Sequence, residues 1–387
     1  MARRTVPPLG RDGRLTYSPA LDGLRGLAVV SVVVFHFDGK VLPGGFLGVD
    51  VFFVLSGYLI ATGLLREYSA RGTIGLKRFW FRRLARLLPP LVAVLIVCLV
   101  LGAVRPVPGQ ASPPGTAVFV LGYISNWYEL LPGPGYLGYM AHAWSLGIEE
   151  QFYVVIPLCL LFLLPRLPPG PPRLALGLSA AATSAAVRGA LYAGTGGALA
   201  HYSTPARFDG LLLGVTAAVL LEQLRDPEQS PRWRLPTATA QASGASCLVG
   251  LLLLWRFAKV DAAATYYLWI LLAGLLTVVI VGLVARQPHN LFSLMLGTAF
   301  LPLLGRLSYS LYLVHFPLSV LLSQYRLSAP VRLLLGIGGS LVLAALLHST
   351  VELPALRWRH RHQEGRDLAP NPETSAAHIA HAGVIPR

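Results

Sequence analysis

The stretch LDGLRGLAVVSVVVFHF, residues 21–37, is mostly apolar and is long enough to cross a lipid bilayer as a helix. It nevertheless carries Arg25 near its start and His36 near its end. Ionisable side chains are costly in hydrocarbon, so residues of this kind inside a span are candidates for function. The stretch therefore predicts a membrane-spanning first helix that also takes part in chemistry.

The rest of the chain has the same apolar character. Only 13% of its 387 residues are charged and 54% are hydrophobic, whereas a soluble domain has about 25% charged residues. We therefore predict an all-α integral membrane protein with about ten transmembrane helices. These are expected near residues 21–37, 46–65, 87–104, 145–164, 173–193, 207–222, 241–256, 266–285, 302–323 and 333–352. The shorter apolar stretch 116–128 is expected to be re-entrant or interfacial.

The positive residues of the loops set the expected orientation. If the N-terminus lies in the cytoplasm, 23 of the 32 Lys and Arg residues fall on the cytoplasmic side and 8 on the outer side. Cytoplasmic loops of membrane proteins carry the excess of Lys and Arg. We therefore expect a multi-pass protein of the cell membrane with both termini cytoplasmic. The net charge of +15 is attributed to this topology rather than to nucleic-acid binding.

This pattern divides the chain into three predicted parts. They are a cytoplasmic N-terminal segment 1–18, a multi-span domain 19–356 and a basic tail 357–387, which is expected to be disordered. All three cysteines lie within apolar runs and lack metal-ligand spacing. Neither a disulfide framework nor a metal site is therefore expected.

Arg25 and His36 are expected to share one face of the first helix. They are eleven residues apart, which is three turns plus about 20°, with a rise of roughly 16 Å between them. One helix face then offers a fixed cation at one depth and a proton acceptor at another. The alternative is that Arg25 extends to the inner headgroups and His36 lies at the outer interface.

The pattern Arg25, ten residues, His36 resembles the Arg-X10-His signature of the acyltransferase family 3 membrane proteins, which are bacterial enzymes that move acyl groups onto sugar hydroxyls. The resemblance covers about residues 18–356. It continues in chain order through GGFLGVDVFFVLSGYLI (44–60), RFWFRRLARLLPP (78–90), HAWSLGIEEQFYVVIP (142–157), TPARFDGLLLG (204–214), RLSYSLYLVHFPL (306–318) and VELP (351–354).

A tight basic cluster precedes the third predicted span. Arg82, Arg83 and Arg86 suit phosphate groups, because guanidinium binds them in a bidentate manner. Coenzyme A carries phosphates on its nucleotide end, so the resemblance implies a donor site for acyl-coenzyme A here. The alternative is a block of topogenic charge, which inner loops commonly carry.

Other polar side chains lie within the predicted spans. The resemblance makes Glu149 a catalytic candidate beside His36 and Arg25, although a structural ion pair between helices is an alternative. The partners expected for the buried carboxylates are Arg25, His36 and the cytoplasmic arginines. Candidate pocket or acceptor residues are Asp50, Tyr153, Ser308, Tyr312 and His315. Ser308, Tyr312 and His315 share one helix face, for which interhelical hydrogen bonding is the alternative.

These residues lead to the expectation of a membrane O-acyltransferase. It would move a short acyl group from acyl-coenzyme A, a co-substrate, to a hydroxyl of a sugar-containing acceptor, either a surface glycan or a macrolide antibiotic or its sugar. His36 would act as the general base, and Arg25 would hold the donor or stabilise charge on the thioester oxygen. Direct and covalent routes both remain open, and no bound cofactor is expected. The alternative is a transporter or flippase, because polar groups inside a bundle also mark substrate paths.

Overall fold

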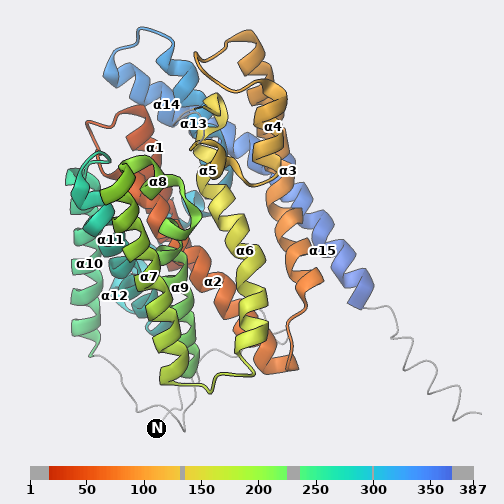
Figure 1. The fold of residues 1–387 in the computed structure, drawn as a ribbon, viewed down its shortest axis with the longest axis vertical. Helices are drawn as coiled ribbons and strands as arrows, with labels where there is room; N and C mark the ends of the chain where they lie inside the picture. Colours follow the sequence, from red (N-terminus) through yellow and green to blue (C-terminus); the bar gives the residue numbers. More distant parts are fainter. Residues whose placement is uncertain (1–16, 131–135, 225–235, 299, 368–387) are drawn as a thin grey trace, which may run out of the picture.

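The computed structural model describes residues 17–130, 136–224, 236–298 and 300–367, and within these ranges the regular secondary structure is entirely helical (Figure 1). The long helices are α1 (Pro19–Phe37), α2 (Gly48–Arg71), α3 (Leu76–Val104), α6 (Trp144–Leu163), α7 (Pro171–Thr195), α9 (Thr204–Gln223), α10 (Thr237–Phe257), α11 (Ile270–Arg286), α13 (Phe300–Ser323) and α14 (Ala329–Leu347). Shorter elements are η1 (Gly45–Leu47), α4 (Pro113–Leu121), α5 (Ser125–Tyr128), η2 (Gly138–Ala143), α8 (Gly197–Tyr202), η3 (Thr265–Trp269), α12 (Leu291–Leu296), η4 (His348–Glu352) and α15 (Leu353–Asp367).

The predicted all-α membrane fold is confirmed. Each predicted span coincides with one of the long helices, and nine stretches of the described chain are long and apolar enough to cross a membrane. The exception is α13, which is 24 residues long but contains Arg306, Ser308 and His315. These polar side chains make α13 less apolar than its neighbours, although two of them, Ser308 and His315, face the protein interior.

Some boundaries differ from the prediction. Helix α3 begins at Leu76, well before the apolar run at residue 87, because the basic stretch continues the same helix. The stretch 116–128 falls on α4 and α5, which have 9 and 4 residues and are too short to span. Residues 357–367 of the expected tail belong to α15, which ends at Asp367. Residues 1–16 of the N-terminal segment and 368–387 of the tail lie outside the described residues.

Helices α1 and α13 pack against each other more extensively than any other pair of described elements. Glycines allow this approach: a Cβ atom at Gly305 would collide with the backbone oxygen of Asp22, and one at Gly26 with that of Leu301. Small residues of this kind let transmembrane backbones come into contact, which favours dispersion and interhelical hydrogen bonds. As a result, the polar side chains of α1 and α13 lie within reach of each other.

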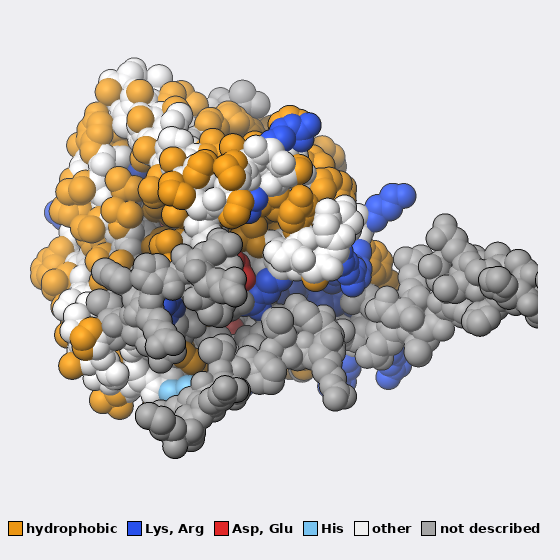
Figure 2. All heavy atoms as spheres, turned by 90° about the horizontal axis from the view of Figure 1, so that it is seen from below, with side chains coloured by type: hydrophobic (Ala, Val, Ile, Leu, Met, Phe, Trp, Pro, Cys, Tyr) orange, Lys and Arg blue, Asp and Glu red, His pale blue; other side chains and the backbone are white. Residues whose placement is uncertain are grey.

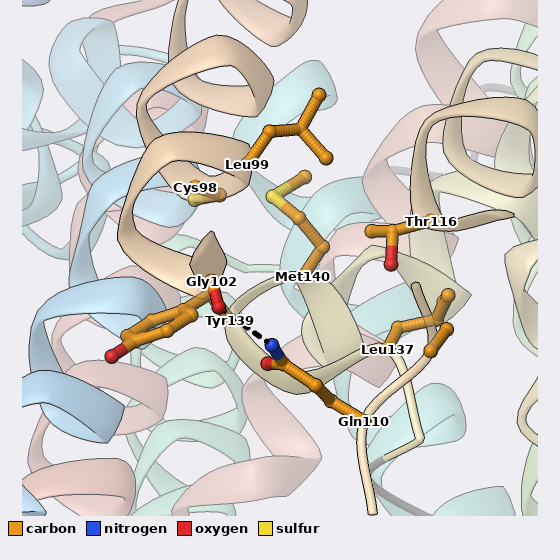
Figure 3. A pocket seen from close by; sticks show the side chains of 9 residues that line it. Cys98, Leu99, Gly102, Gln110, Thr116, Leu137, Tyr139 and Met140 are labelled. Atoms are coloured by element: carbon orange, nitrogen blue, oxygen red, sulfur yellow. Dashed lines mark hydrogen bonds between the residues drawn. The ribbon is translucent and has the colours of Figure 1, made fainter. Parts of the chain in front are cut away.

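A small pocket lies between α3, α4 and η2 (Figure 3). Within it, the amide of Gln110 donates a 3.1 Å hydrogen bond to the backbone oxygen of Gly102. A phenol and a thiol, from Tyr139 and Cys98, line this pocket, but no carboxylate, imidazole or guanidinium does. The hydrogen bond therefore holds the connection that follows α3 against this helix. The pocket itself does not offer the groups expected for acyl transfer.

Candidate active site

The basic end of the bundle, which we define as residues Glu67–Arg86 where α2 ends and α3 begins, gathers several arginines around one carboxylate. Arg78 donates a 2.7 Å hydrogen bond to Glu67, and Arg71 and Arg82 each lie 3.8 Å from the same carboxylate. Figure 2 views the molecule from this end and shows Lys and Arg side chains gathered beside a few acidic ones. With three guanidinium groups against one carboxylate, this surface is positively charged and suits anions.

Arg83 and Arg86 belong to the same helix but extend toward the protein interior. The Arg83 guanidinium lies 5.3 Å from the ring centre of Tyr153 and 5.8 Å from that of Phe79. The buried Nε of Arg86 has no hydrogen-bond partner among the described residues. The structure thus divides the predicted donor cluster, with Arg82 at the rim beside Glu67 and Arg83 and Arg86 leading inward.

Glu149 lies on α6, next to this inward path. Its carboxylate accepts hydrogen bonds from Ser56 at 2.8 Å and from Tyr153 at 3.2 Å. Within the described residues it forms no ion pair closer than 4.0 Å, so the alternative of a structural ion pair does not describe it. Its charge acts on Arg25 and Arg83 only over a longer distance.

Arg25 faces α13. Its Nη2 donates a 3.0 Å hydrogen bond to the hydroxyl of Ser308, and its Nη1 lies 3.9 Å from Asp22. The Arg25 side chain is 18% exposed, so most of it is enclosed by protein. The arrangement therefore differs from that of an arginine that extends to the headgroups.

His36 lies at the other end of α1, against His315 of α13. Nδ1 of His36 is 2.9 Å from the backbone oxygen of Val32 and 3.3 Å from Nε2 of His315. Nδ1 of His315 lies 2.7 Å from the backbone oxygen of Tyr312. The ring of His36 also meets Phe316 edge-on at 5.0 Å between ring centres. His315 is fully buried and His36 is partly buried, so the two imidazoles meet inside the bundle.

The predicted polar face of α13 lies against α1, η2 and α6. Ser145 and Tyr312 are 2.6 Å apart through their hydroxyl groups, and Tyr312 donates a 2.9 Å hydrogen bond to the backbone oxygen of His142. Ser308 contacts Arg25, as described above, and His315 contacts His36. The three residues predicted to share a face therefore do so, and each of them contacts a polar group on another element.

His142 is a candidate that the sequence did not single out. It is 3% exposed, and neither ring nitrogen has a hydrogen-bond partner among the described residues. Its ring stacks on Phe316 at 5.0 Å and lies 5.7 Å from His315. The only available signal was its position in HAWSLGIEE, two residues before the helix that carries Ser145 and Glu149.

Asp50 has a partner that was not predicted. Arg207 of α9 lies 2.8 Å from its carboxylate, and both side chains are almost fully buried. Arg207 is not among the partners expected for the buried carboxylates, so the expected pairing of Asp50 with Arg25, His36 or a cytoplasmic arginine is wrong. A second buried pair, 2.6 Å apart, joins Arg188 of α7 to Asp209 of α9. The Arg207 guanidinium also lies 5.5 Å from the ring of Trp144.

The comparisons with known proteins identify the family of the chain. The family model described as "Acyltransferase domain" matches residues 18–349, which is most of the chain. A provisionally named O-acetyltransferase of Staphylococcus aureus (strain MSSA476) is 30% identical over 365 residues, or 89% of this chain and 59% of that protein. O-acetyltransferase OatA of S. aureus (strain NCTC 8325 / PS 47) is 32% identical over 315 residues, or 80% of this chain and 52% of that protein.

The chain thus spans between half and three fifths of the length of these relatives. No solved structure matches it significantly. Because the family model covers well over half of the residues, the chain belongs to the acyltransferase family 3, and the resemblance seen in the sequence is confirmed.

Proposed function

We propose that this member of the acyltransferase family 3 moves a short acyl group from acyl-coenzyme A to a hydroxyl of a sugar-containing acceptor. The observation that carries the proposal is the alignment of Arg25 and His36 against α13 inside the bundle, with a cluster of arginines at one end. The names of the S. aureus relatives, O-acetyltransferases, support acetyl as the group transferred and oxygen as the acceptor atom.

The arginines of the basic end would hold the phosphates of the donor. Arg82 lies at the rim, and the side chains of Arg83 and Arg86 extend inward. The Nε–H of Arg86 has no acceptor among the described residues and could donate to a phosphate. Charge-assisted hydrogen bonds from guanidinium to phosphate are among the strongest in proteins. The acyl arm of the donor would then point toward Arg25. Glu149 would balance part of the arginine charge and order the hydroxyls of Ser56 and Tyr153.

Arg25 and His36 would act on different parts of the substrates. The helix rise places them roughly 16 Å apart, which is more than an extended arginine side chain covers. We therefore assign Arg25 to holding the donor arm and His36 to the acceptor hydroxyl. His36 takes the hydroxyl proton while the acceptor oxygen bonds to the thioester carbonyl carbon. The C–S bond then breaks, and the departing thiolate of coenzyme A receives the proton from His36.

The acceptor would approach from the end of the bundle that carries His36. Trp144 is only partly buried, two residues after the His142 that packs against His315, and it would offer an aromatic face to a sugar ring at this end. The buried Asp50–Arg207 pair would hold the Trp144 ring in place from behind, because the Arg207 guanidinium lies 5.5 Å from its centre. A surface glycan and a glycosylated macrolide both present such rings, and we propose one of these two classes as the acceptor.

The test uses the full chain in lipid nanodiscs with radiolabelled acetyl-coenzyme A and two acceptor sets, bacterial surface glycans and glycosylated macrolides. The proposal expects label to enter one acceptor set and free coenzyme A to appear in equal amount. The His36→Ala protein should not transfer the label. His289→Ala, at an exposed loop position, is its matched control. Movement of an unmodified acceptor across a vesicle membrane, without acylation, would contradict the proposal and favour a transporter.

A further inference from the structure

We infer that His315 is a positioning residue that fixes the tautomer of His36, so that Nε2 of His36 carries the lone pair that receives the acceptor proton. The inference rests on the proposed function, in which His36 is the general base. It assigns a role to a second histidine and names the reacting nitrogen of the first.

The tautomer of His315 follows from its own backbone contacts. Its Nδ1 lies 2.7 Å from the backbone oxygen of Tyr312 and 3.2 Å from that of Leu311. A carbonyl oxygen can only accept, so Nδ1 of His315 must carry the hydrogen. In a neutral imidazole the other nitrogen then has a lone pair. Nε2 of His315 is therefore an acceptor, and it faces His36 at 3.3 Å.

The tautomer of His36 follows from the same reasoning. Its Nδ1 faces two acceptors, the backbone oxygen of Val32 at 2.9 Å and Nε2 of His315 at 3.3 Å. A lone pair on this nitrogen would oppose both of them, whereas a hydrogen satisfies both in a shared bond. Nε2 of His36 is consequently the unprotonated nitrogen and is the one available as a base.

This arrangement also helps His36 when it becomes charged. The proton that it takes up enters at Nε2, and the hydrogen on Nδ1 then donates more strongly to Val32 and His315. A carboxylate performs this task in Ser-His-Asp triads. A neutral imidazole performs it without placing an unpaired anion in a fully buried, membrane-embedded position, where burial of a charge is costly.

A purely structural role for His315 is the competing explanation, because its ring also packs against His142 and Phe316. Two substitutions separate the two roles. His315→Phe keeps a planar ring and its packing but removes the acceptor nitrogen. His315→Gln gives up the ring but can place an amide oxygen where Nε2 was. A packing role predicts that Phe is the better replacement, and a positioning role predicts that Gln is.

The kinetic test uses the full chain in nanodiscs with acetyl-coenzyme A and the acceptor found for the wild type. His315→Phe should lower kcat about tenfold to a hundredfold with the acceptor KM nearly unchanged, the range expected for loss of one hydrogen bond to a charged group. The kcat of His315→Gln should lie much closer to that of the wild type. Equal losses in both variants, or normal turnover in the Phe variant, would overturn the inference.

A second test reads the tautomer without activity. Histidine labelled with 15N distinguishes protonated from unprotonated ring nitrogens in solid-state NMR spectra, and the signals of His36 and His315 are those that disappear in the His36→Gln and His315→Gln proteins. The inference expects a protonated Nδ1 on both rings and an unprotonated Nε2 on His36. The opposite tautomer on His36 would overturn it. If the spectra agree but His36→Ala still transfers acyl groups, it is the proposed general base that fails.

Discussion

Arg25 and Ser308 lie 283 positions apart in the sequence, yet the guanidinium of one donates a 3.0 Å hydrogen bond to the hydroxyl of the other. His36 and His315 form a second contact between the same two helices, farther along both. Because the two contacts occur in the same order on α1 and on α13, these helices run parallel. The packing of this helix pair therefore fixes the positions of Arg25 and His36 in the candidate site.

Replacing Arg25 by Lys tests whether the guanidinium contacts the donor. Lys keeps the charge but loses the planar fork, which bonds Ser308 through one nitrogen and would leave others for the donor. We expect kcat/KM for acyl-coenzyme A to fall about tenfold or more, equivalent to at least roughly 1.4 kcal/mol. Steady-state kinetics measures this, with the exposed Arg306→Lys as the control. Turnover close to wild type would show that Arg25 only anchors the helix.

Replacing His36 by Ala should abolish transfer while expression and membrane insertion remain normal. Alanine has a lower free-energy cost of insertion into hydrocarbon than imidazole, so α1 should insert at least as well as before. The measurement is acyl transfer per amount of inserted protein, with the exposed His289→Ala treated in the same way. Substantial transfer by the His36→Ala protein would remove the main support for general-base catalysis at this position.

The basic end can be tested through the affinity for the donor. Arg82→Ala and Arg83→Ala should each weaken acyl-coenzyme A binding about ten- to a hundredfold, or about 1.5 to 3 kcal/mol, because each loses a charge-assisted contact. Acceptor binding should be unchanged. Arg166→Ala is the control, since Arg166 is exposed and lies outside the basic end. Donor affinity equal to that of the wild type in both the Arg82 and the Arg83 variant would mean that the cluster serves topology alone.

The buried pair of Asp50 and Arg207 should matter for stability because the loss of one partner leaves the other charge buried and unpaired. Asp50→Ala leaves an uncompensated cation in the interior and is expected to cost about 3 to 5 kcal/mol. Adding Arg207→Met removes that cation and should recover much of the loss. Thermal unfolding in detergent measures both, with the exposed Arg166→Ala as a control expected to cost under about 1 kcal/mol. A double variant no more stable than Asp50→Ala would contradict this account.

The orientation remains a prediction of the loop charges. Reporter fusions after Arg71 and after Trp358 should both report the cytoplasm, because the excess of Lys and Arg lies on that side. Alkaline phosphatase and green fluorescent protein fusions give opposite signals and control for each other. A periplasmic signal at either position would reverse the direction from which donor and acceptor approach the site.

The long helices could be predicted because hydrocarbon imposes a simple rule: about 20 apolar residues in a row. The same rule misses helix ends that lie outside the hydrocarbon. Helix α3 begins at Leu76 and α15 continues to Asp367 because backbone hydrogen bonds propagate a helix whether or not its side chains are apolar. Hydropathy therefore locates the middle of each helix better than its polar ends.

The candidate site was predictable only in part. Helical periodicity places Ser308, Tyr312 and His315 on one face, but it cannot say which neighbour that face meets. The partner of Asp50 lies 157 positions away on α9, and only tertiary packing brings the two together. His142 precedes its helix in the short segment η2, where no periodic pattern marks it.

The close glycine contact between α1 and α13 also has a consequence for biosynthesis. Helix α1, which carries Arg25 and His36, is synthesised before α13, and its partners on α13 follow about 280 residues later. Until then these polar groups have no Ser308 or His315 to bond. The nascent protein must therefore shelter α1 from lipid until α13 has been made, and the contacts of Arg25 and His36 with α13 are completed only then.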